Sequence, residues 1–309
     1  MKKKIAVIAI PVVVFILVWT WLFALPDLAE ELVFEQTPEA LARGAYLVTA
    51  GGCVSCHRSV VADDGIANGV VQNDAENSGA SFSGGFGLET DFGTFYAPNI
   101  TPDKETGIGN WSAEDFLFAL KHGRSPSRSF YYPTFPYRAY AGLSDQDVLD
   151  IGSYLMSLEP VRNQVAEPEI PAWLARWTIA GWNKMADFSQ LLANDTEIYD
   201  DALVARGAYL ARNLGHCGEC HTPRNGLGIP DFRREYHGAE LGDETIEAID
   251  AAALEEWTAN NFDLFLLLGL KPNGEFVGGD MNDVIEHNTS KLTDEDRDAL
   301  AAFFTRSNR

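Results

Sequence analysis

Two copies of the pattern C-x-x-C-H constrain this chain more than any other feature. One copy is Cys53–His57 and the other is Cys217–His221. In this pattern two thiols lie one helical turn apart, so each can add to a vinyl group of one haem. The histidine that follows points its imidazole at the iron as the proximal ligand. The motifs therefore predict two covalently bound haem c groups, held by Cys53, Cys56, His57, Cys217, Cys220 and His221.

Two other uses of paired cysteines agree less well with the sequence. A thioredoxin-like redox pair requires a βαβ context, which neither motif has. A zinc site would need both cysteine pairs in one centre, yet the pairs are far apart in the chain and lie in separate repeats. All four cysteines belong to the motifs, so none is left for a disulfide bond.

The formal net charge of −22 limits the partners of the chain. It argues against binding to nucleic acid, and against docking on anionic lipid by charge alone. It favours a redox partner with a basic docking face, although adaptation to a salty habitat explains the acidity equally well. With 309 residues and 46% hydrophobic content, the chain is long enough for two domains with packed cores and an appendage.

The N-terminal segment predicts a single-pass anchor in the inner membrane. Lys2–Lys4 precede 21 uncharged residues, 5–25, and a helix of about 20 apolar residues spans a bilayer. Pro11 is tolerated in such a helix. A removed signal peptide is the alternative, but its apolar core would be shorter, and Phe23–Pro26 is a poor cleavage site. The lysines place the N-terminus in the cytoplasm and the rest of the chain in the periplasm, where bacteria attach haem c.

An internal repeat indicates two tandem domains. The sequence Ala42–Leu47 recurs as Ala205–Leu210, several residues before each haem motif. Ser144–Asp147 and Thr293–Asp296 are capping signals before two helices with apolar periodicity. Each unit therefore has an N-terminal helix, a haem motif, a middle helix, a ligand loop and a closing helix, the order expected of an all-α cytochrome c domain. Further matches have a constant offset of 146: Trp111 with Trp257, Phe116 with Phe262, Gly123 with Gly269, Pro126 with Pro272 and Phe130 with Phe276.

We therefore expect an all-α fold in which two tandem cytochrome c domains follow a transmembrane helix. The stretch 62–89 is rich in Gly, Ser, Asn and Asp, which predicts a loop. Trp173 and Trp177 are spaced one turn apart on a predicted helix, which favours packing between the domains. A membrane-surface or partner-docking belt is the alternative for them. The predicted segments are an anchor at 1–26, an acidic tether at 27–40, a first domain at 41–166, a connector at 167–200 and a second domain at 201–309.

Met281 is the candidate distal ligand of the second haem. It lies in Gly278–Asn282, a glycine-bearing stretch ahead of the last helix, where a loop could cross the haem face. A methionine thioether is the usual distal ligand of a cytochrome c haem, and it raises the reduction potential. The alternative role for a lone methionine is to fill a core.

The first haem has no equivalent methionine. At the offset of 146, Phe135 stands opposite Met281, and it cannot bind iron. His122 is the only histidine of the first repeat outside the motif, so it is either a ligand or a satisfied surface or core group. Tyr131 and Tyr132 are weaker candidates, and a five-coordinate iron is as plausible as His122. Without methionine the first haem should have the lower potential, so it should donate electrons to the second.

Two further residues flank the second motif. Arg224 is a candidate partner of a haem propionate, with a solvent-exposed arginine as the alternative. His216 precedes Cys217 and cannot bind the same iron from the same side as His221. We therefore expect His216 to pack or to form a hydrogen bond.

The chain resembles membrane-bound multi-haem cytochrome c proteins, which include the cytochrome subunits of bacterial alcohol and gluconate dehydrogenases. The resemblance extends from Ala40 onward and is carried by Phe92–Asp103, Thr106–Ser112, His216–Asn225 and the Met281 stretch. Those subunits usually carry three haems and a Tyr-Pro-x-Met-Pro-Tyr loop. This chain has two haem motifs, and Phe135 replaces the methionine in Tyr132–Tyr137. The resemblance therefore implies a di-haem branch of the group.

The sequence favours a membrane-anchored electron carrier. It would take single electrons from a donor complex or dehydrogenase and pass them to a terminal oxidase or a soluble cytochrome. One alternative is an enzyme that reduces peroxide or another small oxidant at an open first haem. Another is a sensor of a diatomic gas at the same haem. No carboxylate–histidine set beside the open iron can be identified in the sequence, which disfavours catalysis.

Overall fold

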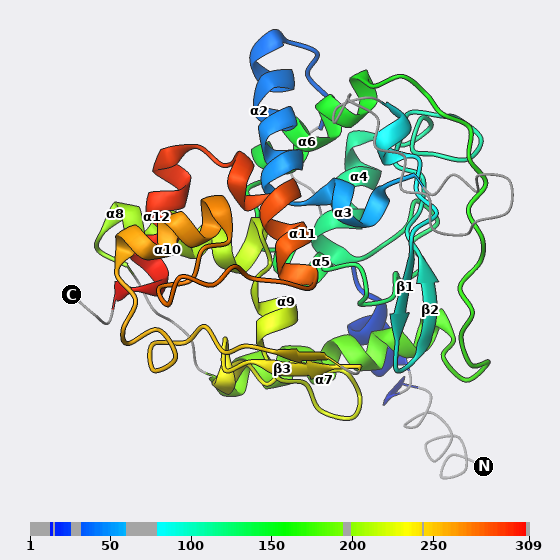
Figure 1. The fold of residues 1–309 in the computed structure, drawn as a ribbon. Coiled ribbons are helices and arrows are strands. Elements are labelled where there is room, and N and C mark those ends of the chain that lie inside the picture. The colour runs from blue at the N-terminus through cyan, green and yellow to red at the C-terminus, as the bar shows by residue number, and fades with distance from the viewer. Residues whose placement is uncertain are drawn as a thin grey trace, which may run out of the picture.

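The computed structural model describes residues 13–14, 16–25, 32–59, 79–193, 199–242 and 244–306. Two helical units lie side by side, and α7 runs along one edge of both (Figure 1). The first unit contains α2 (Pro38–Ala50), α3 (Cys53–His57), η1 (Gly79–Phe82), α4 (Ala113–His122), α5 (Tyr137–Tyr140) and α6 (Asp145–Ser157). The connector forms η2 (Arg176–Thr178) and α7 (Ile179–Ala193). The second unit contains α8 (Ala202–Tyr209), η3 (Leu210–Leu214), α9 (Gly218–His221), η4 (Phe232–Arg234), α10 (Ala259–Leu268), α11 (Asp280–His287), η5 (Thr289–Lys291) and α12 (Asp294–Phe304).

In each unit the N-terminal helix crosses the closing helix at a glycine. α2 crosses α6 at Gly44, and α8 crosses α12 at Gly207. A Cβ atom added at Gly44 would lie 2.0 Å from the carbonyl oxygen of Asp150, and one added at Gly207 would lie 2.0 Å from that of Ala299. Only glycine permits this close approach of two backbones, which explains why the glycine recurs in both copies of the repeat.

Replacing either crossing glycine by alanine is expected to destabilise the protein. Gly44→Ala and Gly207→Ala should each lower the free energy of unfolding by about 3 kcal/mol, because the helices must move apart to admit the methyl group. Gly181→Ala is the control, since nothing lies within 4 Å of a Cβ at this position of α7. Alanine should leave α7 unchanged or slightly more stable. Urea unfolding of the haem-loaded protein measures the stability of all three variants. Equal unfolding midpoints for the crossing variants and the Gly181→Ala control would refute the close crossing.

The middle and closing helices show that the repeat in the sequence is a repeat in structure. α4 and α10 begin at capping boxes formed by Ser112 and Thr258, and both end at a glycine with a left-handed backbone. α6 and α12 begin at Ser144 and Thr293, whose hydroxyls accept hydrogen bonds from backbone N–H groups one turn later. The predicted capping signals are therefore confirmed.

The two units join through a reciprocal pair of tyrosines. The Tyr46 hydroxyl, on α2, donates to the carboxylate of Asp296 at 2.5 Å, at the start of α12 in the other unit. The Tyr209 hydroxyl, on α8, donates to the carboxylate of Asp147 at the start of α6. Each hydroxyl also accepts a hydrogen bond from the backbone N–H of the capping residue, Thr293 or Ser144. The two units therefore meet with approximate twofold symmetry.

Removing either hydroxyl is expected to weaken the junction between the units. Tyr46→Phe and Tyr209→Phe should each lower the free energy of unfolding by about 1–2 kcal/mol, since each loses a hydrogen bond to a carboxylate. Tyr154→Phe is the matched control, because the Tyr154 hydroxyl is buried and has no hydrogen-bond partner among the described residues. Its removal should cost little or nothing. Unfolding in guanidinium measures these variants. If Tyr46→Phe and the control unfold at the same midpoint, the Tyr46 hydroxyl does not stabilise the junction.

The fold is mostly helical, so the all-α prediction is correct only in outline. Two antiparallel hairpins are present, each of two short strands. They are β1 (Gly87–Thr90) with β2 (Gly93–Tyr96), and β3 (Ala239–Leu241) with β4 (Glu244–Ile246). The loop predicted at 62–89 therefore ends in η1 and β1, while residues 60–78 lie outside the described residues. Strands of three or four residues are too short to show a periodic pattern in the sequence.

Of the predicted anchor, residues 1–12, 15 and 26 lie outside the described part of the chain, as do residues 27–31 of the tether. Within the described residues, no helix combines the length and apolar character needed to cross a membrane. Residues 16–23 are helical and pack on the first unit, where the ring of Phe23 lies 5.7 Å from the ring of Phe130.

The prediction that Trp173 and Trp177 pack between the units is wrong. Their side chains are 65% and 69% exposed. Trp182 on α7 makes an inter-unit contact instead, because its indole N–H donates to the carbonyl of Leu227 at 2.8 Å. α7 buries the side that carries Ile179 and Ala186, whereas Trp173 and Trp177 precede this helix, in a turn and in η2.

Candidate haem sites

The two haem motifs form short helices of the same kind. Cys53–His57 make up α3, which follows Gly52 in a left-handed conformation. Gly218–His221 make up α9, with Cys217 as its N-cap. Residues three apart on a helical turn lie on the same side. Each motif therefore presents two thiols and an imidazole from one turn of backbone, as covalent attachment to a haem requires.

Both motif histidines are oriented to bind iron. The Nδ1 atom of His57 lies 2.8 Å from the carbonyl oxygen of Pro98, and that of His221 lies 2.7 Å from the carbonyl oxygen of Glu247. A carbonyl only accepts, so Nδ1 carries the proton and Nε2 keeps its lone pair. Burial also lowers the pKa of both imidazoles, which favours the neutral form that binds metal. The donor set therefore fits two proximal haem ligands.

The hairpins missed in the sequence hold these histidines in place. Pro98 follows β2 and Glu247 follows β4, so each hairpin supplies the carbonyl that orients one imidazole. The backbone of each histidine is fixed as well, because its carbonyl accepts from the N–H of Gly84 or Gly238 at 2.9 and 2.8 Å. Both glycines have positive φ angles and leave no room for a Cβ. Gly84 and Gly238 are therefore the residues in the sequence that could have indicated these two turns.

The thiols are unsuited to thiolate chemistry. Burial raises the pKa of Cys53 and of Cys217 to about 12, with a further increase from the second thiol of each motif. Redox-active and metal-binding cysteines need a thiolate, which a low pKa provides. The environment of the thiols therefore disfavours a dithiol redox pair and agrees with covalent attachment.

The two motifs lie close to each other at the junction of the units. The ring of Tyr140, on α5, lies 5.6 Å from the ring of His216, which directly precedes the second motif. Tyr140 is buried within electrostatic range of both thiols of the first motif, and the Cys56 thiol is within range of Cys220. His216 thus packs against Tyr140, which agrees with the packing role expected for it.

Met281 is the second residue of α11, so the expectation of a loop at this position is wrong. Gly279 precedes the helix with a φ of +63° and lets the chain turn into it. Asp280 lies within electrostatic range of the Cys220 thiol, which places the N-terminal end of α11 beside the second motif. The same helix also contacts α3, where Asp283 lies 3.8 Å from Arg58. α11 therefore contacts the helix of the first motif, while Asp280, next to Met281, is within electrostatic range of the second.

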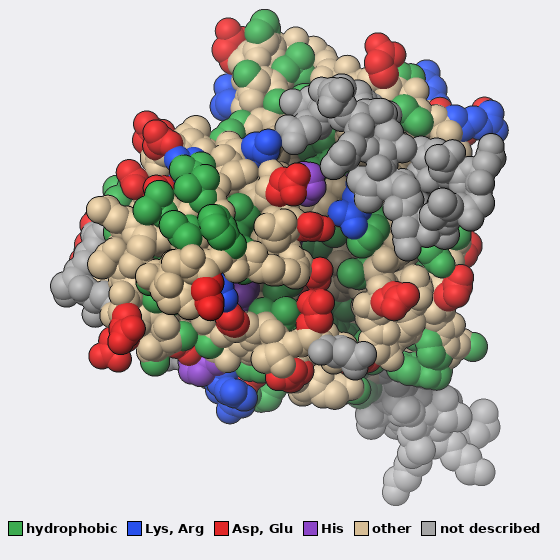
Figure 2. All heavy atoms as spheres, in the orientation of Figure 1, with side chains coloured by type: hydrophobic (Ala, Val, Ile, Leu, Met, Phe, Trp, Pro, Cys, Tyr) green, Lys and Arg blue, Asp and Glu red, His purple; other side chains and the backbone are tan. Residues whose placement is uncertain are grey.

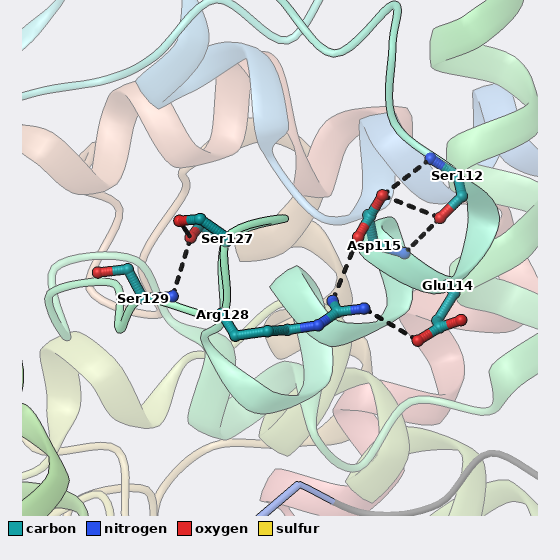
Figure 3. A network of polar contacts seen from close by, with 7 residues as sticks. Ser112, Glu114, Asp115, Ser127, Arg128 and Ser129 are labelled. Carbon is teal, nitrogen blue, oxygen red and sulfur yellow. Dashed lines mark hydrogen bonds and ion pairs between the residues drawn. The ribbon is translucent and has the colours of Figure 1, made fainter. Parts of the chain in front are cut away.

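Phe135 belongs to an aromatic cluster beside the first motif. Its ring lies 5.9 Å from that of Tyr131, 6.4 Å from that of Tyr137 and 5.7 Å from that of Tyr140. The loop that leads to this cluster is fastened to the start of α4, where Arg128 pairs with Glu114 and Asp115 (Figure 3). Phe135 thus lies against the tyrosine that borders the first pair of thiols.

The other candidate ligands of the first haem have different neighbours. His122 ends α4 with its ring against Phe118, and the charged groups that affect its pKa are Lys121, Arg124 and Asp145. None of these residues belongs to the haem motif. The Tyr132 hydroxyl donates to the carbonyl of Leu174 in the connector, at 2.9 Å. Burial raises the pKa of Tyr131 to about 12, so its hydroxyl stays protonated.

Two partly or fully buried arginines are candidate partners of haem propionates. Arg224 is half-buried and not solvent-exposed, and its guanidinium pairs with the carboxylate of Glu219 inside the second motif. Arg124, which sequence reasoning missed, is only 5% exposed and stacks 3.3 Å from the ring of Phe130. No carboxylate of the described residues pairs with Arg124, and burial lowers its pKa to about 10. A haem propionate is an anion that could supply the missing partner.

Comparison with known proteins agrees with this geometry. The family model described as Cytochrome c matches residues 41–159. A curated relative from Cereibacter sphaeroides, "Diheme cytochrome c-type", is 43% identical over 281 residues, which cover 89% of this chain and 88% of the relative. The chain belongs to the diheme c-type cytochromes. This diheme cytochrome carries two covalent haem c groups, as its two C-x-x-C-H motifs predict.

The diheme cytochrome is also related to subunits of larger enzymes. It is 34% identical to the gluconate 2-dehydrogenase cytochrome c subunit of Pantoea cypripedii and 32% identical to the alcohol dehydrogenase (quinone) cytochrome c subunit of Gluconobacter oxydans. The alignments cover 88% and 87% of this chain, but only 60% and 55% of those longer relatives. The family resemblance inferred from the sequence is therefore confirmed.

Proposed function

We propose that the diheme cytochrome is a membrane-anchored periplasmic carrier of single electrons. It would receive electrons from a dehydrogenase or donor complex and pass them to a terminal oxidase or a soluble cytochrome. The names of the relatives support a dehydrogenase as the donor, because they are cytochrome c subunits of gluconate and alcohol dehydrogenases. In this proposal residues 5–25 form the anchor, and 41–166 and 201–309 form the two haem domains.

The closeness of the two motifs is the observation that carries this proposal. Each haem, when bound, supplies one-electron oxidation and reduction of its iron. The protein places both attachment helices against one junction, where Tyr140 and His216 lie between them. The Tyr140 ring is buried, and that of His216 is partly buried. Such an arrangement suits transfer within the chain better than two independent sites.

Different distal ligands would set the direction of transfer. We propose Met281 as the distal ligand of the second haem, because the end of α11 lies beside the second motif. For the first haem, Phe135 supplies no ligand, which leaves His122 or an open position. A methionine ligand raises the haem potential. The first haem would then donate and the second accept.

The charge of the chain would guide partner choice. Acidic side chains are spread over the face drawn in Figure 2, and several border the hollow at its centre. With a net charge of −22, the diheme cytochrome would attract a partner with a basic face. The rate of electron transfer to such a partner should therefore fall as ionic strength rises.

Spectroscopy of the reduced protein tests the proposal against its alternatives. An electron carrier should show two low-spin haems, two separate potentials and no response to carbon monoxide. A high-spin component that shifts with carbon monoxide would favour an enzyme or a gas sensor at the first haem. A His122→Ala variant then separates the two possibilities for that haem, because it creates a high-spin component only if His122 is the ligand.

A further inference from the structure

The outward side of α7 is apolar. Met185, Phe188, Leu191 and Leu192 recur every three or four residues, so they form one stripe along the helix. Phe188 is 60% exposed and Leu191 is 73% exposed. The opposite side of α7 is buried against the protein. The stripe therefore has no packing partner among the described residues.

Two exposed tryptophans precede α7 in the connector. Trp173 and Trp177 are among the most exposed large apolar side chains of the described residues. We call the set Trp173, Trp177, Met185, Phe188, Leu191 and Leu192 the α7 face. Exposed apolar surface of this extent marks an interaction site, particularly in an acidic chain with ample charge for solubility.

The N-terminal helix lies against the same part of the molecule. Leu22 and Phe23 pack on the cluster that contains Ile179 and Ala180 of α7. The ammonium group of Lys184 lies 5.1 Å from the centre of the Trp21 ring, and Trp21 is itself exposed. In Figure 1 the described N-terminal residues lie beside α7 at the lower edge of the molecule. Exposed apolar side chains of α7 therefore lie near the C-terminal end of the uncharged run 5–25, to which Trp21 and Phe23 belong.

We propose that the α7 face lies in the headgroup region of the phospholipid bilayer that holds the N-terminal anchor. This inference rests on the anchor in the proposed function. Tryptophan is enriched at the membrane–water interface, where its ring is partly apolar and partly hydrated. An amphipathic helix with phenylalanine and leucine on its outer side inserts shallowly at the same depth.

The contact would fix the orientation of the protein as well as its location. A single anchor leaves the haem domains free to swing, whereas a second contact along α7 holds one edge of both units on the bilayer. Trp182 and Ser189 tie α7 to the second unit, through the carbonyls of Leu227 and Pro230. The attachment would therefore hold the second motif at a constant height above the membrane.

Hydroxyl-radical footprinting of the full chain tests this contact. The diheme cytochrome is placed in phosphatidylcholine nanodiscs, one chain in each disc, and oxidation is read by mass spectrometry. Phe188 is compared with Phe276, a phenylalanine of similar exposure (72%) in the second unit. We expect oxidation of Phe188 to be about tenfold slower than that of Phe276, since lipid shields side chains held below the headgroups.

Equal oxidation of the two phenylalanines in the discs would overturn the proposal and leave electron carriage untouched. Protection of Phe188 that occurs only in native membranes, with other subunits present, would also overturn it, in favour of a protein partner. A chain that stays out of the discs would refute both the anchor and the α7 contact. Haem content and potentials, measured on the same sample, report separately on the proposed function.

Discussion

Replacing Cys217 and Cys220 together by alanine is expected to leave one covalent haem in each chain instead of two. Both thiols of the motif carry the thioether bonds, so no attachment point remains on α9. The same exchange at Cys53 and Cys56 should remove the other haem. Intact-mass measurement and the absorbance of the pyridine adduct both count the haems. Only loss of the second motif should remove the methionine-ligated haem from the spectrum.

Controls make this result specific. Ser55→Ala and Glu219→Gln change residues inside the motifs without touching a thiol or an imidazole, and each should keep both haems. Glu219→Gln also removes the partner of Arg224, so it tests whether this ion pair matters for attachment. If the alanine variants keep two haems, or if the purified chain contains zinc and no haem, the assignment of the cysteines is wrong.

Met281→Leu is expected to lower the reduction potential of the second haem and to leave that of the first haem unchanged. Leucine has a similar volume and no iron ligand, so the helix should fold while the distal position loses its thioether. The fall should be on the order of 0.1–0.2 V, within the range of about 0.8 V over which axial ligands set haem potentials. A spectroelectrochemical titration of the wild type and the variant measures both potentials.

Two comparisons complete that experiment. Met156→Leu changes a methionine near the end of α6, in the first unit, and should shift neither potential. Phe135→Met tests the reverse change, since a thioether near the first motif should raise the lower potential if it reaches the iron. An unchanged potential in Met281→Leu would exclude this methionine as a ligand. If the wild-type haem with methionine has the lower potential, electrons would flow in the opposite direction.

The sequence predicted the parts of this protein that depend on local patterns. The C-x-x-C-H spacing requires one turn of helix, and α3 and α9 form at those residues. The offset of 146 identified equivalent middle helices through matched residues such as Phe116 and Phe262, and the structure adds that both helices begin at capping boxes. Two covalent haems followed from the motifs alone, and the relative from Cereibacter sphaeroides confirmed them.

Other features could not be predicted, because they depend on residues far apart in the chain. The carbonyls of Pro98 and Glu247 orient the haem histidines only after two hairpins form, and neither hairpin is long enough to leave a periodic pattern. Met281 was expected in a loop, but it lies in the first turn of α11. The chain turns at Gly279, directly before this helix. The exposure of Trp177, in η2, likewise depends on how the connector packs on the two units.

The sequence by itself thus determined what this protein binds and where the thiols and imidazoles stand along the chain. Covalent attachment depends on a few residues within one helical turn, so a short local sequence is enough to predict it. The tertiary structure alone decided how the two halves meet, through Tyr46 on Asp296 and Tyr209 on Asp147, and which apolar side chains remain exposed. Those outcomes depend on the packing of whole helices, because a side chain is buried or exposed only relative to what lies opposite it.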